Sequence, residues 1–265
     1  MLNLQKKMST FLFDKIIFGP VNSRRLGVSL GINLLPTTAK VCNFNCIYCE
    51  CGWNGPNDAH EKLPSREEVK RLLEEKLTEM AEANMIPDVI TFAGNGEPTV
   101  HPHFAEIIDD TLELRNHLCP NAKVAVLSNA TTIGREKVFN ALLKVDQNIL
   151  KLDAASDSIV TTLNQPTQAY NVAKKVEELK RYNGKFILQT LFIQGVYNGT
   201  SIDNSTPEEV EKWLKIVAEL HPSEVMIYTI SRDTPADSLK KVSTHRLNEI
   251  AQMVKDLGIA TSVSS

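Results

Sequence analysis

Short apolar runs rich in β-branched residues alternate with longer segments of helical periodicity along most of this chain. Each run has the length of a strand, and the segments between the runs are long enough to cross from one strand to the next. Strands joined in this way pair in parallel, have right-handed crossovers and are apolar on both faces. The pattern predicts six strands, at 29–36, 88–95, 123–130, 148–155, 185–195 and 224–231.

Two of the helical segments have clear starts. Ser65 and Glu68 form a capping box ahead of an apolar helical face, and Thr206, Pro207 and Glu209 give the same signal further along. Further helices are expected over roughly 104–118, 135–144, 168–182 and 244–258.

The number of strand–helix units limits the architecture. A closed TIM barrel needs eight such units, whereas an open partial barrel and a doubly wound sheet both fit six. We expect the α/β class and a partial (β/α)6 TIM-like barrel, in a single domain over 1–265 with its core at roughly 28–263. In either architecture, ligands bind at the carboxyl ends of the strands.

The composition is that of an ordinary globular chain, with 265 residues, 42% hydrophobic and 23% charged. With 29 basic against 32 acidic residues, no global positive field attracts nucleic acid or an anionic membrane. Lys6, Lys7, Asp14 and Lys15 interrupt the apolar stretches at the start, which predicts neither a signal peptide nor a membrane span. We expect a cytoplasmic protein with no membrane partner.

Four of the five cysteines lie within ten positions, directly after the first expected strand. Cys42, Cys46 and Cys49 have the spacing C-x3-C-x2-C, whereas a structural zinc site usually joins two short pairs across a longer gap. Cys51 is too close to Cys49 to form half of such a pair, and Cys119 stands alone. Three thiolates can hold three irons of a four-iron cluster and leave the fourth iron open for chemistry. A structural zinc module in a binding protein is the alternative from another class.

The segment around these cysteines resembles the C-x3-C-x-aromatic-C signature of the radical S-adenosylmethionine (SAM) enzymes, with Tyr48 at the aromatic position. The resemblance implies a radical SAM core in which Cys42, Cys46 and Cys49 bind a [4Fe-4S] cluster. It also implies that SAM binds at the open iron and that the reduced cluster cleaves it to methionine and a 5′-deoxyadenosyl radical, which takes a hydrogen from the substrate. Such an enzyme needs an electron donor such as flavodoxin or ferredoxin.

A second motif, "AGNGEPTVHP", follows the second expected strand. It resembles the family's Gly-Gly-Glu segment, which binds the amino group of SAM, but it places Asn95 between Gly94 and Gly96. Glycines let a backbone approach closely, and a carboxylate such as Glu97 accepts from a desolvated ammonium. We therefore expect these four residues at the SAM site, with Glu97 as the main contact. A Gly-rich turn from strand to helix is the structural alternative.

Polar residues at the ends of the later strands complete the candidate site. Lys151 and Asp153 share one face of their strand by the two-residue period, and charges on a central strand need a polar cavity or a partner. An internal ion pair between them is the alternative to a substrate or ribose contact. We assign Tyr48, Asn129, Asp153 and Gln189 to the cofactor, and Lys151, Tyr228 and Arg232 to the substrate.

The run "SRRLG" at 23–27 resembles the opening of a radical SAM subfamily grouped with the wyosine tRNA-modifying enzymes. Arg24 and Arg25 are candidates for binding a phosphate or carboxylate of the substrate or of SAM, or for a solvated turn. The wyosine enzymes carry additional cysteines for a second cluster, and the N-terminal segment here has no such triplet. We therefore favour a small-molecule or peptide substrate, with wyosine-like modification of a tRNA base as the alternative function.

Overall fold

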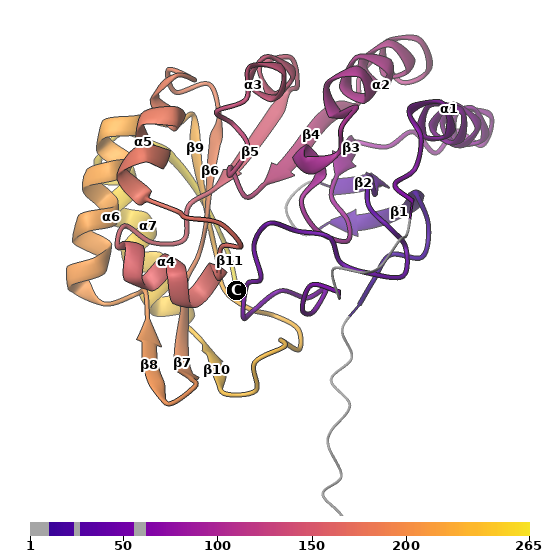
Figure 1. The fold of residues 1–265 in the computed structure, drawn as a ribbon. Coiled ribbons are helices and arrows are strands. Elements are labelled where there is room, and N and C mark those ends of the chain that lie inside the picture. Colours follow the sequence, from indigo (N-terminus) through magenta and orange to yellow (C-terminus); the bar gives the residue numbers. More distant parts are fainter. Residues whose placement is uncertain (1–10, 24–26, 56–61) are drawn as a thin grey trace, which may run out of the picture.

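The computed structural model describes residues 11–23, 27–55 and 62–265. Within these ranges, eight strands form one main sheet in the order β1-β2-β3-β4-β5-β6-β9-β11, and three more form a small sheet in the order β10-β7-β8 (Figure 1). The strands of the main sheet are β1 (Ile17–Ser23), β2 (Gly27–Ile32), β3 (Val89–Phe92), β4 (Lys123–Ser128), β5 (Gln147–Lys151), β6 (Ile187–Leu191), β9 (Glu224–Tyr228) and β11 (Ala260–Ser264). The small sheet consists of β7 (Ile193–Tyr197), β8 (Thr200–Asp203) and β10 (Leu239–Lys241).

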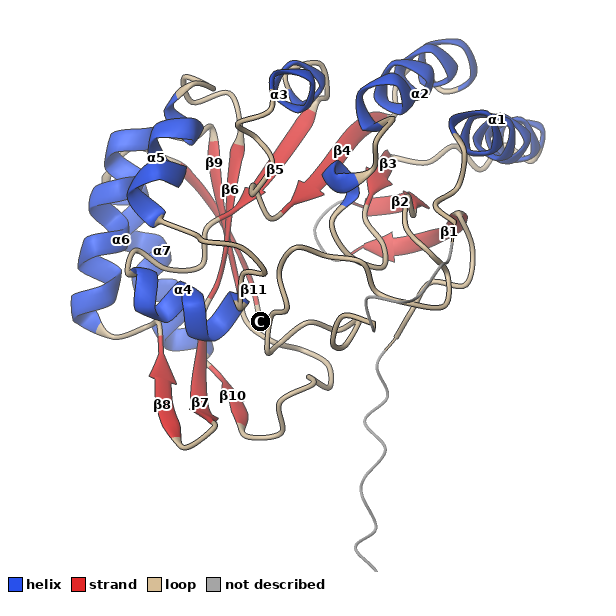
Figure 2. Cartoon of the chain, viewed as in Figure 1, coloured by secondary structure: helices blue, strands red, loops and turns tan. Residues whose placement is uncertain are grey.

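The main sheet is parallel from β2 to β11, and β1 pairs antiparallel with β2. The helices cover the outer face of the sheet, while loops cross its inner, concave face (Figure 2). Among the described residues β1 and β11 form the two edges, so the sheet is an open, partial barrel. The predicted α/β class and partial (β/α)6 barrel are confirmed, with β2, β3, β4, β5, β6 and β9 at the six predicted positions.

The helices begin where the sequence places their caps. Ser65 accepts a hydrogen bond from the Glu68 N–H, and Thr206 accepts one from the Glu209 N–H. No helix in the described part of the chain is both long and apolar enough to cross a membrane. The helices are α1 (Arg66–Glu82), α2 (Phe104–Leu118), α3 (Glu136–Leu142), α4 (Asp157–Asn164), α5 (Val172–Lys180), α6 (Pro207–Leu220) and α7 (Thr244–Asp256), and a 3₁₀ turn, η1, covers Pro98–Val100.

The predicted strand at 185–195 is in fact two strands in different sheets. β6 ends at Leu191 and β7 begins at Ile193. The Asn204 side chain accepts from the Ile193 N–H and donates to the Leu191 carbonyl, so the backbone groups at the junction are satisfied outside the main sheet. Gly195 adopts a φ of 149°, and a Cβ there would lie 2.3 Å from a carbonyl oxygen of the segment before β10. An apolar run by itself does not reveal where a chain changes sheets.

Two strands of the main sheet, β1 and β11, have no counterpart among the predicted strands. Both lie at edges, where one side of a strand has no neighbouring strand and fewer apolar residues are needed. β11 adds a seventh parallel strand next to β9. The predicted helix at 168–182 is shorter, because Asn171 caps α5 and the preceding residues form a loop.

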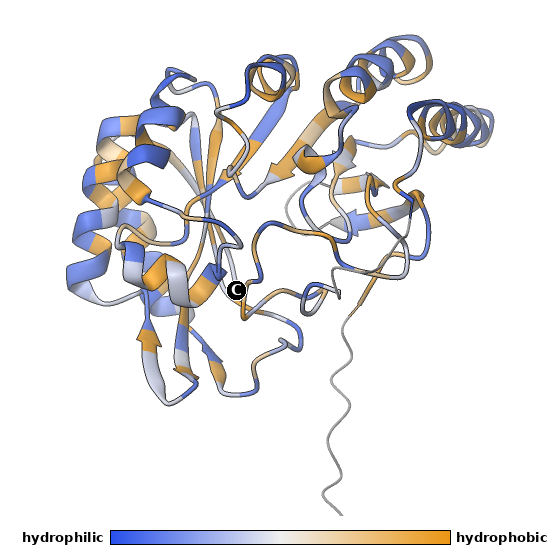
Figure 3. Cartoon of the chain, viewed as in Figure 1, coloured by the Kyte–Doolittle hydropathy of each residue, from blue (hydrophilic) through white to orange (hydrophobic). Residues whose placement is uncertain are grey.

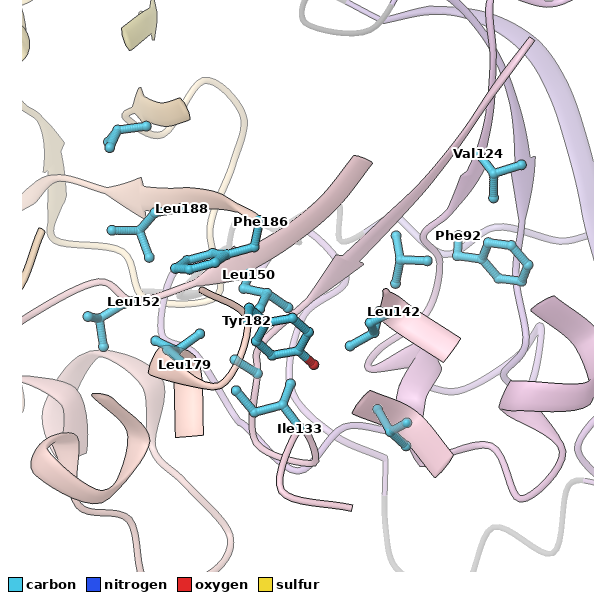
Figure 4. Close-up of a cluster of buried hydrophobic side chains, with 14 of the residues drawn as sticks. Phe92, Val124, Ile133, Leu142, Leu150, Leu152, Leu179, Tyr182, Phe186 and Leu188 are labelled. Atoms are coloured by element: carbon cyan, nitrogen blue, oxygen red, sulfur yellow. The ribbon is translucent and has the colours of Figure 1, made fainter. Parts of the chain in front are cut away.

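Alternation along the strands divides the core into two layers. Phe92, Val124 and Leu150 belong to the larger layer, in which Leu150 lies beside Tyr182 (Figure 4). Hydrophobic residues accordingly gather on the strands, and hydrophilic residues on the outward turns of the helices (Figure 3). A smaller apolar layer lies on the concave face and consists of Val89, Ala125, Ile149, Ile187 and Met226.

The same two-residue period places the candidate site. Leu127, Lys151, Gln189 and Tyr228 each follow a residue of the small apolar layer by two positions, so they face the concave side one step nearer the carboxyl ends. All four line the same cavity. The small apolar layer therefore forms the floor beneath the candidate site.

Candidate active site

The loop from β2 to α1 carries four of the cysteines and crosses the concave face of the sheet (Figure 1). It is called the cysteine loop below. Backbone contacts fix it on two sides, because Val41 pairs with Gly96 after β3 and Phe44 pairs with Pro166 after α4. Further backbone hydrogen bonds join the loop to the end of α4. The positions of the thiols thus depend on segments that are distant in sequence.

This loop covers a cavity of about 310 Å³ at the carboxyl ends of the parallel strands, called the cysteine cavity below. The thiols of Cys42, Cys46 and Cys49 all line it, as does Cys51. Most of the other predicted site residues line it too, namely Tyr48, Gly94, Gly96, Glu97, Asn129, Lys151, Gln189, Tyr228 and Arg232.

Nitrogen donors surround two of the three thiols. The Cys42 sulfur lies 3.4 Å from the Phe44 backbone nitrogen and 3.5 Å from Asn129 Nδ2, and burial raises the pKa of this thiol. Burial also raises the pKa of Cys46 to about 11, and Asn164 Nδ2 lies 3.4 Å from its sulfur. Such N–H groups stabilise a metal-bound thiolate, whose proton is released when the metal binds.

Cys49 differs from the other two. A hydrogen bond from the Cys51 thiol lowers the pKa of Cys49, and the same bond raises the pKa of Cys51. The Cys51 sulfur also lies 3.5 Å from the Gly94 carbonyl oxygen. Cys51 is therefore a hydrogen-bonding neighbour of a predicted ligand.

The converging thiols fit an iron–sulfur cluster. Cys42, Cys46 and Cys49 line one cavity, and N–H donors lie beside the sulfurs of Cys42 and Cys46. Across residues 11–23, 27–55 and 62–265, no three His, Cys, Asp or Glu side chains are arranged to hold one metal ion.

Glu97 is a buried carboxylate at the cavity wall, with 2% of its surface exposed. Its Oε1 accepts from the Thr99 backbone N–H at 3.1 Å and the Ser128 hydroxyl at 2.9 Å, and its Oε2 accepts from the Asn129 N–H at 2.6 Å. Burial nevertheless raises the pKa of this carboxyl above its usual range. A cationic group in the cavity would favour its ionised form.

The glycines of the second motif bring two backbones together. A Cβ at Gly96 would lie 1.8 Å from the Val41 carbonyl oxygen, and one at Gly94 would lie 2.3 Å from Asn33 Oδ1. Asn95 does not line the cavity: its side chain donates to the Phe13 and Pro36 carbonyls and accepts from the Phe13 N–H. Asn95 thus joins the segment before β1 to the start of the cysteine loop at Pro36, and the two glycines let that loop approach closely.

Lys151 forms an ion pair with Asp153, which was one of the two alternatives expected from the sequence. Its Nζ lies 3.4 Å from Asp153 Oδ1, donates to the Tyr228 hydroxyl and sits 5.3 Å from the centre of the Tyr48 ring. Burial lowers the pKa of Lys151, but the Asp153 and Tyr228 charges outweigh it, so its pKa is raised overall. The ammonium is held charged at the cavity wall.

Asp153 does not line the cavity, and its side chain is fully buried. Its Oδ2 accepts from the Tyr48 hydroxyl and from Asn164 Nδ2, and its Oδ1 accepts from the Leu191 N–H at 2.9 Å. Because Asn164 also faces the Cys46 sulfur, this network joins the ends of β5 and β6 to the cysteine loop. Asp153 acts on the cavity through its neighbours.

The remaining predicted residues lie around the cavity or outside the described residues. Gln189 is buried next to Lys151 in the strand register, and Arg232 forms an exposed ion pair with Glu50 at 2.6 Å. Arg24 and Arg25 lie outside the described residues.

Several residues that line the cavity were not predicted, among them Phe13 and Lys40. Phe13 contributes from the segment before β1, which carries no recognisable signal for the site. Lys40 is 3% exposed, and its ammonium donates to the Gly52 carbonyl at 2.9 Å. Its position two residues before Cys42 was the available signal, because a lysine next to thiolates supplies compensating charge.

A match between this chain and a model of a known protein family identifies the family. The model described as the radical SAM superfamily matches residues 37–192, more than half of the chain. The chain therefore belongs to the radical SAM superfamily. The enzymes of this superfamily use a [4Fe-4S] cluster and SAM, so the family resemblance noted in the sequence is confirmed.

Two curated proteins are similar over most of the chain. A Brachyspira hyodysenteriae protein named GTPase Obg is 28% identical over 249 residues, which cover 92% of this chain and 34% of that protein. A Helicobacter pylori UPF0026 protein is 30% identical over 221 residues, or 82% of this chain and 67% of that protein. The chain thus spans about a third of the first relative and two thirds of the second.

Solved structures share the fold at low identity. A radical SAM methyltransferase from Sphaerobacter thermophilus superposes with a TM-score of 0.65 at 16% identity, covering 89% of this chain and 65% of that one. Streptococcus suis SuiB bound to the precursor peptide SuiA has a TM-score of 0.62 at 15% identity, with coverages of 89% and 48%. TYW1 with a lysine-pyruvate adduct has a TM-score of 0.58 at 14% identity, with coverages of 86% and 73%.

Proposed function

We propose that this enzyme cleaves SAM reductively and abstracts a hydrogen from a small-molecule or peptide substrate. The observation that carries the proposal is the convergence of three thiols and one buried carboxylate, Glu97, on a single cavity at the carboxyl ends of the strands. When bound, the cluster supplies the electron that breaks the sulfonium bond of SAM.

Each wall of the cavity has a proposed role. Cys42, Cys46 and Cys49 would hold three irons of the cluster, and Lys40 would offset part of the negative charge that the thiolates bring. Glu97 would accept from the SAM ammonium, because its burial makes an ion of opposite charge favourable there. A substrate held in the same cavity would then give a hydrogen atom to the 5′-deoxyadenosyl radical, forming 5′-deoxyadenosine.

The other lining residues are proposed to position the two ligands. Tyr48, Asn129 and Gln189 would contact SAM, with Asp153 holding Tyr48 in place. The roles of Gly94, Gly96 and Asn95 follow from their packing, since they fix the cysteine loop and the segment before β1. Lys151, Tyr228 and Arg232 would bind the substrate, and Arg24 with Arg25 would extend that contact.

The substrate is proposed to be small or peptidic. The cavity of about 310 Å³ has room for a small group beside the thiols, and the SuiB structure with its precursor peptide shows that another enzyme with this fold takes a peptide. We further propose flavodoxin or ferredoxin as electron donor, a cytoplasmic location, where thiols stay reduced, and a single domain over 1–265.

Anaerobic reconstitution tests the proposal directly. The wild-type protein should bind iron and sulfide and, with dithionite, convert SAM to 5′-deoxyadenosine, whereas Cys42→Ala, Cys46→Ala or Cys49→Ala should lose this conversion. Cys119→Ala is the matched control, because this buried thiol lies in the main core away from the cavity. Protein that takes up zinc but no iron would overturn the proposal.

A further inference from the structure

A second cavity, of about 440 Å³, lies on the other side of the cysteine loop and is called the polar cavity below. Its walls come from the loop after β4, the segment between α4 and α5, and the first turn of α5. Asn43, between two of the cluster cysteines, also lines it. The polar cavity therefore opens at the same carboxyl edge of the sheet at which ligands of parallel sheets bind.

The polar cavity carries a surplus of positive charge. Its lining includes Arg135, Lys174 and Lys175 but only one carboxylate, that of Glu178. Lys175 and Glu178 form an ion pair with each other, and Lys175 also donates to two backbone carbonyls of the loop after β4. Within the described ranges, the side chains of Arg135 and Lys174 form no hydrogen bond or ion pair. Two cations thus remain available to a ligand in a chain whose net charge is −3.

Arg135 and Lys174 reach the polar cavity from different elements of the fold. A Cβ at Gly134 would lie 2.9 Å from Glu178 Oε1, so the glycine lets the loop that bears Arg135 close against α5. Asn171 caps α5 by accepting from the Lys174 N–H, which fixes the backbone at the base of the second cation. The fold therefore sets the backbone positions from which the two cations extend.

The two cavities share a wall of hydrogen-bonded side chains. Thr131, which lines the polar cavity, donates to Asn129 Oδ1 at 2.6 Å and accepts from Asn43. Asn129, which lines the cysteine cavity, donates to Asn43 Oδ1 at 2.7 Å and contacts the Cys42 sulfur. A ligand in the polar cavity would lie one layer of side chains away from a predicted cluster ligand.

We propose that the polar cavity is a binding site for a phosphoryl group, held between the Arg135 guanidinium and the Lys174 ammonium. A planar guanidinium binds a phosphate through two parallel hydrogen bonds, and an ammonium adds a point charge. Thr131 and Asn43 on the same wall are hydrogen-bonded to each other and to Asn129, so the two cations supply the contacts to the phosphoryl group. This proposal does not rest on cleavage of SAM, so the two fail independently.

Titration calorimetry of the full chain with pyrophosphate at constant ionic strength tests the site. Wild-type protein should bind saturably, and Arg135→Ala combined with Lys174→Ala should weaken binding by about tenfold or more. Both side chains are exposed, so the double variant should retain the wild-type melting temperature. The matched control is Lys137→Ala, an exposed cation of α3 that pairs with Glu106 at 3.6 Å and does not line the cavity.

The source of the phosphoryl group is separated by a second titration, with tRNA. Loss of tRNA binding in the double variant but not in Lys137→Ala assigns the site to a nucleic-acid backbone. Pyrophosphate binding without tRNA binding assigns it to a small phosphorylated molecule. An absence of saturable binding to either probe, or an equal loss in Lys137→Ala, overturns the proposal.

Discussion

The cysteine cavity and the polar cavity lie on opposite sides of one loop but are built in different ways. Backbone contacts enclose the first, since Val41 meets Gly96 and Phe44 meets Pro166, and its thiols are largely buried. Exposed cations mark the second, and they extend from the residue before α3 and from the first turn of α5. The difference indicates that the cysteine cavity tolerates few changes of shape, whereas the polar cavity depends mainly on charge.

The sharpest test of this difference is Gly96→Ala. The new Cβ would lie 1.8 Å from the Val41 carbonyl oxygen at a φ of 138°, so we expect a loss of about 3 kcal/mol or more in the free energy of unfolding. The cysteine loop should move and cluster iron should be lost, as measured by iron analysis after reconstitution.

Gly199→Ala provides the control for that variant. Gly199 also has a positive φ, of 77°, but a Cβ there meets nothing within 4 Å. It should cost about 1–2 kcal/mol through backbone strain alone and leave the iron content unchanged. Equal losses of iron in the two variants would show that the close approach at Gly96 is unimportant.

The next effect concerns charge inside the cysteine cavity. Glu97→Gln removes the carboxylate while keeping its shape, so SAM affinity should fall roughly ten- to a hundredfold with the cluster still assembled. Equilibrium binding of SAM to the reconstituted protein measures this loss. Glu50→Ala, at the exposed rim and paired with Arg232, should change the affinity little. Unchanged affinity in Glu97→Gln would remove Glu97 from the SAM site.

The smallest effect concerns the N–H groups near the sulfurs. Asn164→Leu removes the donor that lies 3.4 Å from the Cys46 sulfur. Hydrogen bonds to sulfur favour the more negative, reduced cluster, so the reduction potential should fall by some tens of millivolts. Redox titration followed by electron paramagnetic resonance measures the shift. Asn171→Ala, which removes the α5 cap, should lower the melting temperature without moving the potential.

Local sequence patterns predict much of the fold. The capping residues Ser65 and Thr206 mark the starts of α1 and α6, because a cap is satisfied within three residues of itself. The edge strand β11 and the separation of β6 from β7 were missed, since both depend on partners far away in the chain.

The functional site also has features that the sequence predicts and features that depend on distant partners. The cysteine spacing and the Gly-Asn-Gly-Glu run point to the cluster and to SAM before any contact is known. They do not reveal that Asn95 turns away from the cavity to bind the backbone of Phe13 and Pro36, or that Asp153 is buried behind Tyr48. Side-chain direction after a strand ends is not set by the strand period, so sequence reasoning placed both residues in the cavity.

Three features can be read from the sequence without any structure. They are the α/β class, the three spaced cysteines after the first expected strand, and the glutamate that follows a glycine after the second. Only the tertiary structure decided which side chains meet, because the thiols are positioned by contacts with Gly96 and Pro166, more than 50 residues away in the chain. The polar cavity is also a product of packing alone. Arg135 and Lys174 lie in separate helical segments, and only the closure of one loop against α5 brings their charges to a common space.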